Sequence, residues 1–463
     1  MEPLKIAVVG SGVAGLSAAW LLSRTHRLVV LERAERLGGH AHTVDVVEDR
    51  QGVERRVPID TGFIVYNTAC YPNLIALFDH LGVPTAPTKM TFAVSLGNGA
   101  YEYAGSARGL MGQPANLFKP AHWQLVRDVL RFFREADGLA ALEDDVDTSL
   151  ADWLNARGYS QAFIARHIRP MAAAIWSTPS KEVLDFPAAA FARFFQNHGL
   201  LQVRNRPQWR TVRGGSREYV TRIADALRTG HGGTGVPADV RTGQGVRSVA
   251  RRGGKIDVAF EDGSRETFDR VLFATHADEA LAMIEAPSAD ERKLLGAFRY
   301  ARNETYLHRD ARLMPKRRHL WASWNYVGDE TDDALCVSYH MNTLQPLDTA
   351  RDYIVTLNPI TPIRDETILG HWTYTHPIFD RAAMTAQREL GRIQGLGGIW
   401  HAGAYMGYGF HECGAQAGLA AAEAMGGPGV RRPWQVANEN DRVAYLSRAA
   451  LRAAAAPLAE AAE

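Results

Sequence analysis

The sequence predicts an α/β fold organised around a parallel sheet, and two separate segments carry that prediction. In the first, an apolar run at residues 5–9 leads through a glycine-rich turn into an apolar helix, and then into a second apolar run that ends on Glu32. In the second, a strand ending at Gly403 is followed by a loop and by a helix that begins near Cys413. Alternation of strands and helices is typical of a parallel sheet covered by helices.

The glycine-rich turn has the pattern Gly-x-Gly-x-x-Gly, and each glycine has its own expected role. Gly10 permits the tight turn, Gly12 lets a pyrophosphate approach the backbone, and Gly15 lets the helix pack closely on the strand. The first helical residues, Val13 and Ala14, offer free N–H groups and a partial positive charge to phosphates. This arrangement predicts a dinucleotide site.

The acid that ends the second strand supports the same conclusion. Glu32 lies about 20 residues after the first glycine, the spacing expected for a carboxylate that binds ribose hydroxyls. Arg33 follows it directly. A carboxylate here argues against a 2′-phosphate and therefore against NADP. A purely structural glycine turn, the alternative, does not account for the helix and the acid together.

Composition excludes several classes of protein. The chain has 463 residues, 46% hydrophobic and 22% charged, which describes a soluble globular protein of two or three domains. Its net charge of +1 gives no field that would attract nucleic acid. Its three cysteines are too far apart for a disulfide framework or a metal site. No apolar stretch is long enough to span a bilayer, so we expect a cytoplasmic protein.

The remaining segments predict elements in a recognisable order. Alternation predicts strands over 44–47 and 58–66, around a turn at 49–52, and again over 90–105; helical spacing predicts helices over 71–81, 115–205 (with stops at Pro170, Pro179 and Pro187) and 219–228. A glycine pair predicts a hairpin that begins at Val246, and further buried strands are expected over 270–276 and 398–404.

These patterns of predicted strands and helices divide the chain into two interleaved domains and a tail. We predict a discontinuous cofactor domain at residues 1–88, 209–285 and 391–430, an α+β substrate domain at 89–208 and 286–390, and an Ala- and Arg-rich tail at 431–463.

A second glycine pair carries a family resemblance. The segment 36–43, Arg-Leu-Gly-Gly-His-Ala-His-Thr, resembles one found in the two-dinucleotide-binding-domain flavoproteins, the group of the monoamine oxidases and phytoene desaturases. In that family the segment lies against FAD, so the resemblance implies FAD and a Rossmann-type FAD-binding domain. His40 stands where the family usually has an arginine, which also raises the alternative of a histidine linked covalently to the flavin.

The resemblance extends to further segments and implies a set of FAD contacts. The loop after Asp60 and the segment 401–418 correspond to family segments that pass near the flavin, and the helix in the latter would point at its pyrimidine end. The cofactor-binding residues predicted from both lines of argument are Gly10, Gly12, Val13, Ala14, Gly15, Glu32, Arg33, Gly38, Gly39, His40, Thr43, Thr61, Gly62, Phe63, Val246, Gly403, Ala404, Gly409, Phe410, Cys413 and Gly414.

Some positions depart from the amine oxidases. Glu412 lies one residue earlier than the usual acid, and His411 aligns with an aromatic wall of the amine cage. The stretch 300–308, where a lysine near the flavin is common in amine oxidases, contains no lysine. We take His411 and His276, which ends a strand aimed at the cofactor, as candidate catalytic bases or hydrogen-bond donors; the alternative is that either is structural.

Two features indicate an apolar substrate. Residues 117–139 form an amphipathic pattern in which Trp123, Val126 and Leu130 are accompanied by basic residues such as Arg127 and Arg134. Such a helix could rest on an anionic membrane surface, peripherally at the inner face, or could simply pack on its own domain. The aromatic segments 321–326 and 372–379 could line an apolar tunnel or belong to the core.

More narrowly, residues 1–427 resemble a group of bacterial amine-oxidase-like flavoproteins, through residues 38–43, 60–67, 341–345, 376–379 and 409–412. Members often accompany cyclopropane-fatty-acid-synthase-like methyltransferases, which implies a lipid substrate and a methyltransferase as functional partner. We predict an FAD-dependent dehydrogenase or desaturase of a fatty-acyl or other lipid chain. The alternatives are an amine oxidase, a double-bond isomerase, and a non-enzymatic flavoprotein that holds lipid for the methyltransferase.

Overall fold

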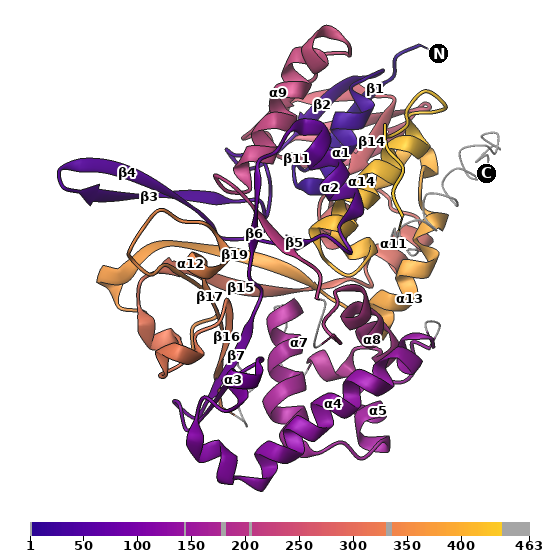
Figure 1. Ribbon diagram of the computed structural model, residues 1–463. Helices are drawn as coiled ribbons and strands as arrows, with labels where there is room; N and C mark the ends of the chain where they lie inside the picture. Colours follow the sequence, from indigo (N-terminus) through magenta and orange to yellow (C-terminus); the bar gives the residue numbers. More distant parts are fainter. Residues whose placement is uncertain (1, 143–144, 177–181, 203–205, 330–335, 438–463) are drawn as a thin grey trace.

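The computed structural model describes residues 2–142, 145–176, 182–202, 206–329 and 336–437 (Figure 1). The predicted helix stop at Pro179 and the predicted tail beyond residue 437 lie outside the described residues. Within the described chain, no helix combines the length and the apolar character that crossing a membrane requires.

A five-stranded parallel sheet forms the centre of the first layer. Its strands, in spatial order, are β10 (Asp239–Arg241), β2 (Arg27–Leu31), β1 (Lys5–Val9), β14 (Arg270–Phe273) and β20 (Ile399–His401). Every neighbouring pair is parallel. The strands come from all three predicted parts of the cofactor domain, and the short edge strand β10 was not predicted.

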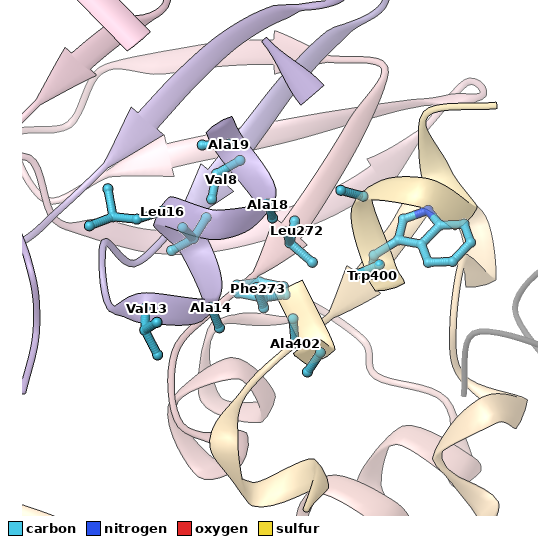
Figure 2. Close-up of a cluster of buried hydrophobic side chains, with 14 of the residues drawn as sticks. Val8, Val13, Ala14, Leu16, Ala18, Ala19, Leu272, Phe273, Trp400 and Ala402 are labelled. Carbon is cyan, nitrogen blue, oxygen red and sulfur yellow. The ribbon is translucent and has the colours of Figure 1, made fainter. Parts of the chain in front are cut away.

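Two helices pack together on this sheet. Helix α1 (Val13–Leu22) is buried along its whole length, which agrees with its uniformly apolar sequence. Helix α14 (His411–Met425) lies beside it, and begins before the predicted Cys413. A Cβ on Gly418 would lie 2.1 Å from the carbonyl oxygen of Ala14, so only glycine permits this contact. Figure 2 shows side chains of α1, among them Ala14 and Ala18, beside Leu272 and Phe273 of β14, and Trp400 of β20 belongs to the same apolar core.

A seven-stranded mixed sheet forms the second layer. Its order is β19 (Ile368–Ile378), β15 (Arg299–His308), β18 (Ile354–Leu357), β17 (Val337–His340), β16 (Trp324–Gly328), β7 (Phe92–Leu96) and β8 (Tyr101–Ala104). Strands β16 and β7 are parallel, and the other neighbours are antiparallel. The strands predicted over 90–105 are therefore confirmed, on one edge of this sheet.

Helices fill the other side of the second layer, as the sequence predicts for 115–205. They are α3 (Ala107–Leu110), η1 (Pro114–Phe118), α4 (Pro120–Ala140), α5 (Leu150–Ala156), α6 (Gln161–Phe163), η2 (Ile164–Ile168), α7 (Arg169–Trp176), η3 (Glu182–Asp185) and α8 (Ala188–Asn197). The helices from α4 to α8 share a separate apolar core that includes Phe132, Phe163 and Phe191. Figure 1 shows these helices together at the bottom of the molecule.

The connecting elements follow the predictions in part. The strand predicted over 58–66 ends at Asp60, because the backbone of Thr61 and Phe63 turns to hydrogen-bond with His42 and His40. The strands are β3 (Thr43–Arg50), β4 (Val53–Asp60), β5 (Tyr66–Asn67), β6 (Thr85–Thr88), β9 (Trp209–Val212), β11 (Val246–Arg252), β12 (Lys255–Phe260) and β13 (Arg265–Phe268). The helices are α2 (Pro72–Leu81), α9 (Arg217–Gly233), α10 (Ala277–Met283), α11 (Ala289–Leu295), α12 (Met341–Leu344) and α13 (Arg381–Glu389). The predicted hairpin that begins at Val246 turns at Gly253 and Gly254.

Packing crosses the predicted domain boundaries in two places. Leu294 and Leu295 of α11 and Ala383 of α13, predicted as substrate-domain residues, belong to the apolar core of the parallel sheet. In the other direction, Val46 and Ile59 of the β3–β4 hairpin join a core with residues of the seven-stranded sheet. The boundaries themselves stay a prediction, because the two layers share side chains.

Candidate functional site

A cavity of about 690 Å³ lies where the carboxyl ends of the parallel strands meet the second sheet. This edge of a parallel sheet is where α/β proteins bind nucleotides. The predicted residues that line it are Gly10, Gly12, Val13, Ala14, Glu32, Arg33, Gly39, His40, Gly62, Phe63, Val246, His276, Gly403, Ala404, Gly409, Phe410 and His411. The fold therefore brings residues from all three predicted parts of the cofactor domain (1–88, 209–285 and 391–430) to one cavity.

The glycine turn forms one end of the cavity. A Cβ on Gly12 would meet nothing within 4 Å, so the missing side chain leaves an open cradle beside the backbone. No side chain caps the N-terminus of α1, and its first N–H groups are therefore available to an anion. Gly39 closes this cradle from the other side, since its Cβ would lie 3.1 Å from the Cα of Gly12.

Glu32 lies at the same end and is held in place by its neighbours. One carboxylate oxygen accepts hydrogen bonds from the Ser11 backbone N (3.0 Å) and Oγ (2.6 Å). The other accepts from the backbone N of Ala34 at 2.9 Å. A carboxylate fixed in this way keeps lone pairs for ribose hydroxyl groups.

Six of the predicted cofactor residues do not line the cavity: Gly15, Gly38, Thr43, Thr61, Cys413 and Gly414. Gly15 serves packing, because its Cβ would lie 2.0 Å from the Gly10 carbonyl oxygen. The Thr43 hydroxyl donates to buried Asp60 at 2.6 Å, and Cys413 Sγ accepts from the backbone of Tyr408.

Thr61, Gly38 and Gly414 also make contacts within the protein. Thr61 Oγ1 lies 2.8 Å from Tyr374 Oη. A Cβ on Gly38 would lie 2.7 Å from the Ala41 carbonyl oxygen, and one on Gly414 would lie 2.7 Å from Val13 Cγ1. These three residues therefore support the cavity wall from behind.

The cavity wall also carries a cluster of histidine rings. The His40 ring centroid lies 6.2 Å from that of His276 and 5.3 Å from that of His376. Burial, followed by the neighbouring histidines, holds the pKa of His40 well below its usual range, and burial lowers the pKa of His376 to about 4. The cluster is therefore uncharged near neutral pH.

The two candidate catalytic histidines both reach this cavity. The His411 ring stacks on Phe63 with centroids 3.7 Å apart, and its Nε2 lies 3.2 Å from Tyr219 Oη. Burial lowers the pKa of His411 to about 3, so it is a weak proton acceptor and better suited to hydrogen bonding. His276 stacks on Tyr300 at 4.2 Å, and burial lowers its pKa as well.

His376 is a site residue that the sequence analysis did not single out as catalytic. Its Nδ1 lies 3.0 Å from the amide nitrogen of Asn303, whose oxygen accepts from Asn358 Nδ2 at 2.7 Å. The Asn303 nitrogen is thus the donor, and the proton of the neutral imidazole must be on Nε2 of His376. That N–H is a fixed donor at the cavity wall.

Apolar side chains complete the wall around the histidines. Trp324, Tyr374 and Phe379 confirm that the predicted aromatic segments contribute to the lining, whereas Tyr326 is buried in the core. Helix α7 adds Ile175 and its neighbours, which no sequence signal indicated. The substrate end is therefore apolar and aromatic, with neutral imidazoles.

Comparison with known proteins decides the family. The family model described as flavin containing amine oxidoreductase matches residues 13–301. The chain belongs to this family. Its cofactor is FAD, and the site fits this group: the Gly12 cradle is open, α1 is uncapped, and His40 Nε2 is buried without a hydrogen-bond partner in the described chain.

Solved structures of the family share the fold. A fatty acid isomerase from P. acnes is 16% identical and has a TM-score of 0.62; the match covers 90% of this chain and 97% of that one. Putrescine oxidase with bound putrescine is 16% identical with a TM-score of 0.63, covering 91% and 98%. Cyclohexylamine oxidase from Brevibacterium oxydans IH-35A is 15% identical with a TM-score of 0.64, covering 92% and 99%.

A curated relative matches only a short segment. L-amino acid oxidase from Cerastes cerastes is 45% identical over 43 residues, which is 9% of this chain and 8% of that protein. The chain is thus an enzyme of the FAD-dependent amine oxidoreductase family, and none of these likenesses fixes its substrate.

Glu412, the acid that lies one residue earlier than in the amine oxidases, binds the start of α2. Its carboxylate accepts from the backbone N (2.9 Å) and side-chain nitrogen (3.0 Å) of Asn73, and from the backbone N of Leu74 (2.8 Å). These donors lie at the N-terminus of α2, where a negative charge is stabilising. Glu412 therefore holds α2 against α14, and it is not among the residues that line the cavity.

Proposed function

We propose that this FAD enzyme removes a hydride from a carbon–carbon bond of a lipid or fatty-acyl substrate. The observation that carries the proposal is the apolar and aromatic character of much of the cavity wall. Trp324, Tyr339 and Phe379 line it together with Ile175 and neutral imidazoles, and the charged residues of the lining are Glu32, Arg33, Arg36 and Glu279. An uncharged hydrocarbon chain suits such a wall.

An alkylammonium substrate suits it less well. Among the described residues that line the cavity there is no lysine, and His411 occupies the place expected for an aromatic cage residue. The ring of His411 is already stacked on Phe63, so one face of it is unavailable to a cation. These features favour the acyl substrate over the amine oxidase alternative.

The residues of the chain would position the substrate. The chemistry that the cofactor supplies is acceptance of a hydride from a substrate carbon. The substrate would lose a hydride to the cofactor and a proton to the imidazole of His276, one of the two predicted bases on the cavity wall, and would gain a double bond. The electrons would pass on to oxygen or another acceptor. The N–H on Nε2 of His376 would donate a hydrogen bond to an oxygen of the acyl group, while Trp324 and Phe379 would exclude water from the reacting bond.

A redox-neutral isomerase is the second candidate. One solved structure of the same fold is that of a CLA-producing fatty acid isomerase, and this likeness supports isomerisation as the second candidate. In that reaction the hydride would return to another carbon of the chain. Because burial lowers the pKa of His411 to about 3, His411 would hold the substrate by a hydrogen bond and would not store a proton.

Anaerobic mixing tests the proposal. We expect the visible flavin absorbance to bleach when the holoenzyme meets phospholipid with unsaturated acyl chains or free fatty acid, and not with primary amines. Bleaching with amines alone would refute the acyl proposal. Mass spectrometry of the recovered lipid distinguishes loss of two hydrogens from isomerisation, which leaves the mass unchanged.

Two variants of one residue test its role in the site. His411→Ala should slow flavin reduction without releasing FAD. His411→Phe keeps the stack on Phe63 but removes the ring nitrogens, so it separates hydrogen bonding from packing. Unchanged reduction kinetics in both variants would remove His411 from the catalytic site.

A further inference from the structure

The lower edge of the helical layer exposes an unusual group of large apolar side chains. Along α3, η1 and α4 these are Met111 (52% exposed), Phe118 (86%), Trp123 (53%) and Leu130 (50%). Figure 1 shows the three elements running along the bottom of the molecule. Single exposed apolar residues are normal on proteins, but several along one continuous segment mark an interaction surface.

Helix α4 can expose apolar residues because its other face supplies the contacts to the domain. Leu125, Phe132, Ala136 and Leu139 are buried. The last three of these belong to the apolar core of the helical layer. Trp123 and Leu130 lie outside that buried stripe. The Trp123 indole N–H already donates to the Leu117 carbonyl oxygen at 2.8 Å, so the exposed part of the ring is purely apolar.

Basic side chains are interspersed with these apolar ones. Arg108, Arg127 and Arg134 are exposed along the same segment, with Arg127 72% exposed. The acidic side chains of α4 are engaged within the protein: Asp128 is buried and accepts from Ser160 N, Glu135 accepts from Arg131 and Tyr159, and Asp137 accepts from Gln196. Asp137 is the one exposed acid of α4 and stands against the exposed Arg108, Arg127 and Arg134, so the outward surface is apolar with a net positive charge.

We propose that residues 107–140 form a docking surface for an anionic lipid bilayer. Phe118 and Trp123 enter the interfacial region, and the arginine stems lie along it with their guanidinium groups at lipid phosphates. The charge is complementary to anionic headgroups and selects this occupant over an apolar partner protein. The surface does not include any residue that lines the cavity, and the inference holds whether or not an acyl chain is the substrate.

Sedimentation of the holoenzyme with vesicles tests the proposal. We expect binding to phosphatidylcholine vesicles that contain phosphatidylglycerol, weak binding to phosphatidylcholine alone, and loss of binding in high salt. The variant Phe118→Ser/Trp123→Ser should bind at least tenfold more weakly. Each of Arg127→Gln and Arg134→Gln should weaken binding about fivefold. The matched control Val53→Ser, at an exposed apolar residue of the β3–β4 turn, should bind like the wild type.

The readout separates this inference from the proposed function. Binding is measured with lipids of any acyl chain and requires no turnover, while the visible flavin spectrum reports that each variant is folded and loaded. Equal vesicle binding by wild type and the Phe118/Trp123 variant would overturn the proposal. Concentration-dependent association without vesicles, abolished by the same substitutions, would show instead that the surface joins two copies of the chain.

Discussion

Gly12→Ala separates cofactor binding from folding more cleanly than any other single substitution in the site. Gly12 has φ −66° and ψ −179°, a conformation open to every residue, and a Cβ there would meet nothing within 4 Å. The apoprotein should therefore keep its stability within about 0.5 kcal/mol, or gain slightly through a less flexible unfolded chain. The new methyl group nevertheless fills the cradle where a phosphate would approach the backbone.

The expected loss falls on FAD affinity alone. Displacing one phosphate oxygen from a charge-assisted N–H contact costs about 1.5–3 kcal/mol, which corresponds to a roughly ten- to hundredfold rise in Kd. Titrating apoprotein with FAD and following flavin fluorescence measures the Kd, and urea unfolding of the same apoprotein measures its stability. Gly12→Val, with a larger side chain, should lose more affinity.

Two other glycines serve as controls. Gly138, in α4, also has nothing within 4 Å of a new Cβ, so Gly138→Ala should gain about 0.5–1 kcal/mol of helix stability and leave the Kd unchanged. Gly15→Ala would place a Cβ 2.0 Å from the Gly10 carbonyl oxygen and should lose folded protein altogether. If Gly12→Ala and Gly12→Val both keep the wild-type Kd within twofold, the phosphate does not lie at this turn.

Three further outcomes concern stability. Glu412→Gln should cost about 1–3 kcal/mol in urea unfolding, because an amide NH₂ would face the donors that the carboxylate accepts. Gly418→Ala should cost at least as much, since its Cβ would lie 2.1 Å from the Ala14 carbonyl oxygen; calorimetry of the holoenzyme measures this. Acid should unfold the protein near pH 5, followed by circular dichroism. Burial lowers the pKa to about 4 in each of four histidines, His167, His198, His308 and His401. In the unfolded chain the same histidines bind protons from about pH 6.5 downward. By pH 5 each of them therefore lowers the free energy of unfolding by roughly 2 kcal/mol. A midpoint below pH 3.5 would contradict this assignment.

The nucleotide end of the site could be predicted because its determinants are local. A tight turn, an uncapped helix and an acid at a fixed spacing depend on backbone geometry that a short stretch of sequence specifies. Gly12, Glu32 and Gly39 accordingly lie where the sequence places them. Residues such as Thr43 and Cys413 are harder to place from sequence, since a segment that passes the cavity also has side chains that point away from it, and the sequence does not say which.

The substrate end could not be predicted in the same way. Its wall combines Ile175 of α7, Tyr339 of β17 and His376 of β19, which only the long-range pairing of the seven-stranded sheet brings together. The aromatic segments were ambiguous for the same reason. Trp324 and Tyr326 lie two residues apart in β16 and therefore face the same side of the sheet, yet Trp324 lines the cavity while Tyr326 is buried in the core beside it. The difference depends on which elements cover each part of that face, and the alternation of the strand does not specify this.

His40, one of the two histidines at which this chain departs from the amine oxidases, has a consequence for the ligand that the site can hold. An arginine in place of His40 would bring a permanent charge into a buried cluster of rings, where it would need an anionic partner. His40 instead stays neutral, and its buried Nε2 has no partner among the described residues. An unpaired polar atom in such a position is costly unless a ligand completes it. Because the imidazole is neutral, that ligand group need carry no charge, and an acyl oxygen or a polar edge of the cofactor meets this requirement better than an ammonium ion that must leave water.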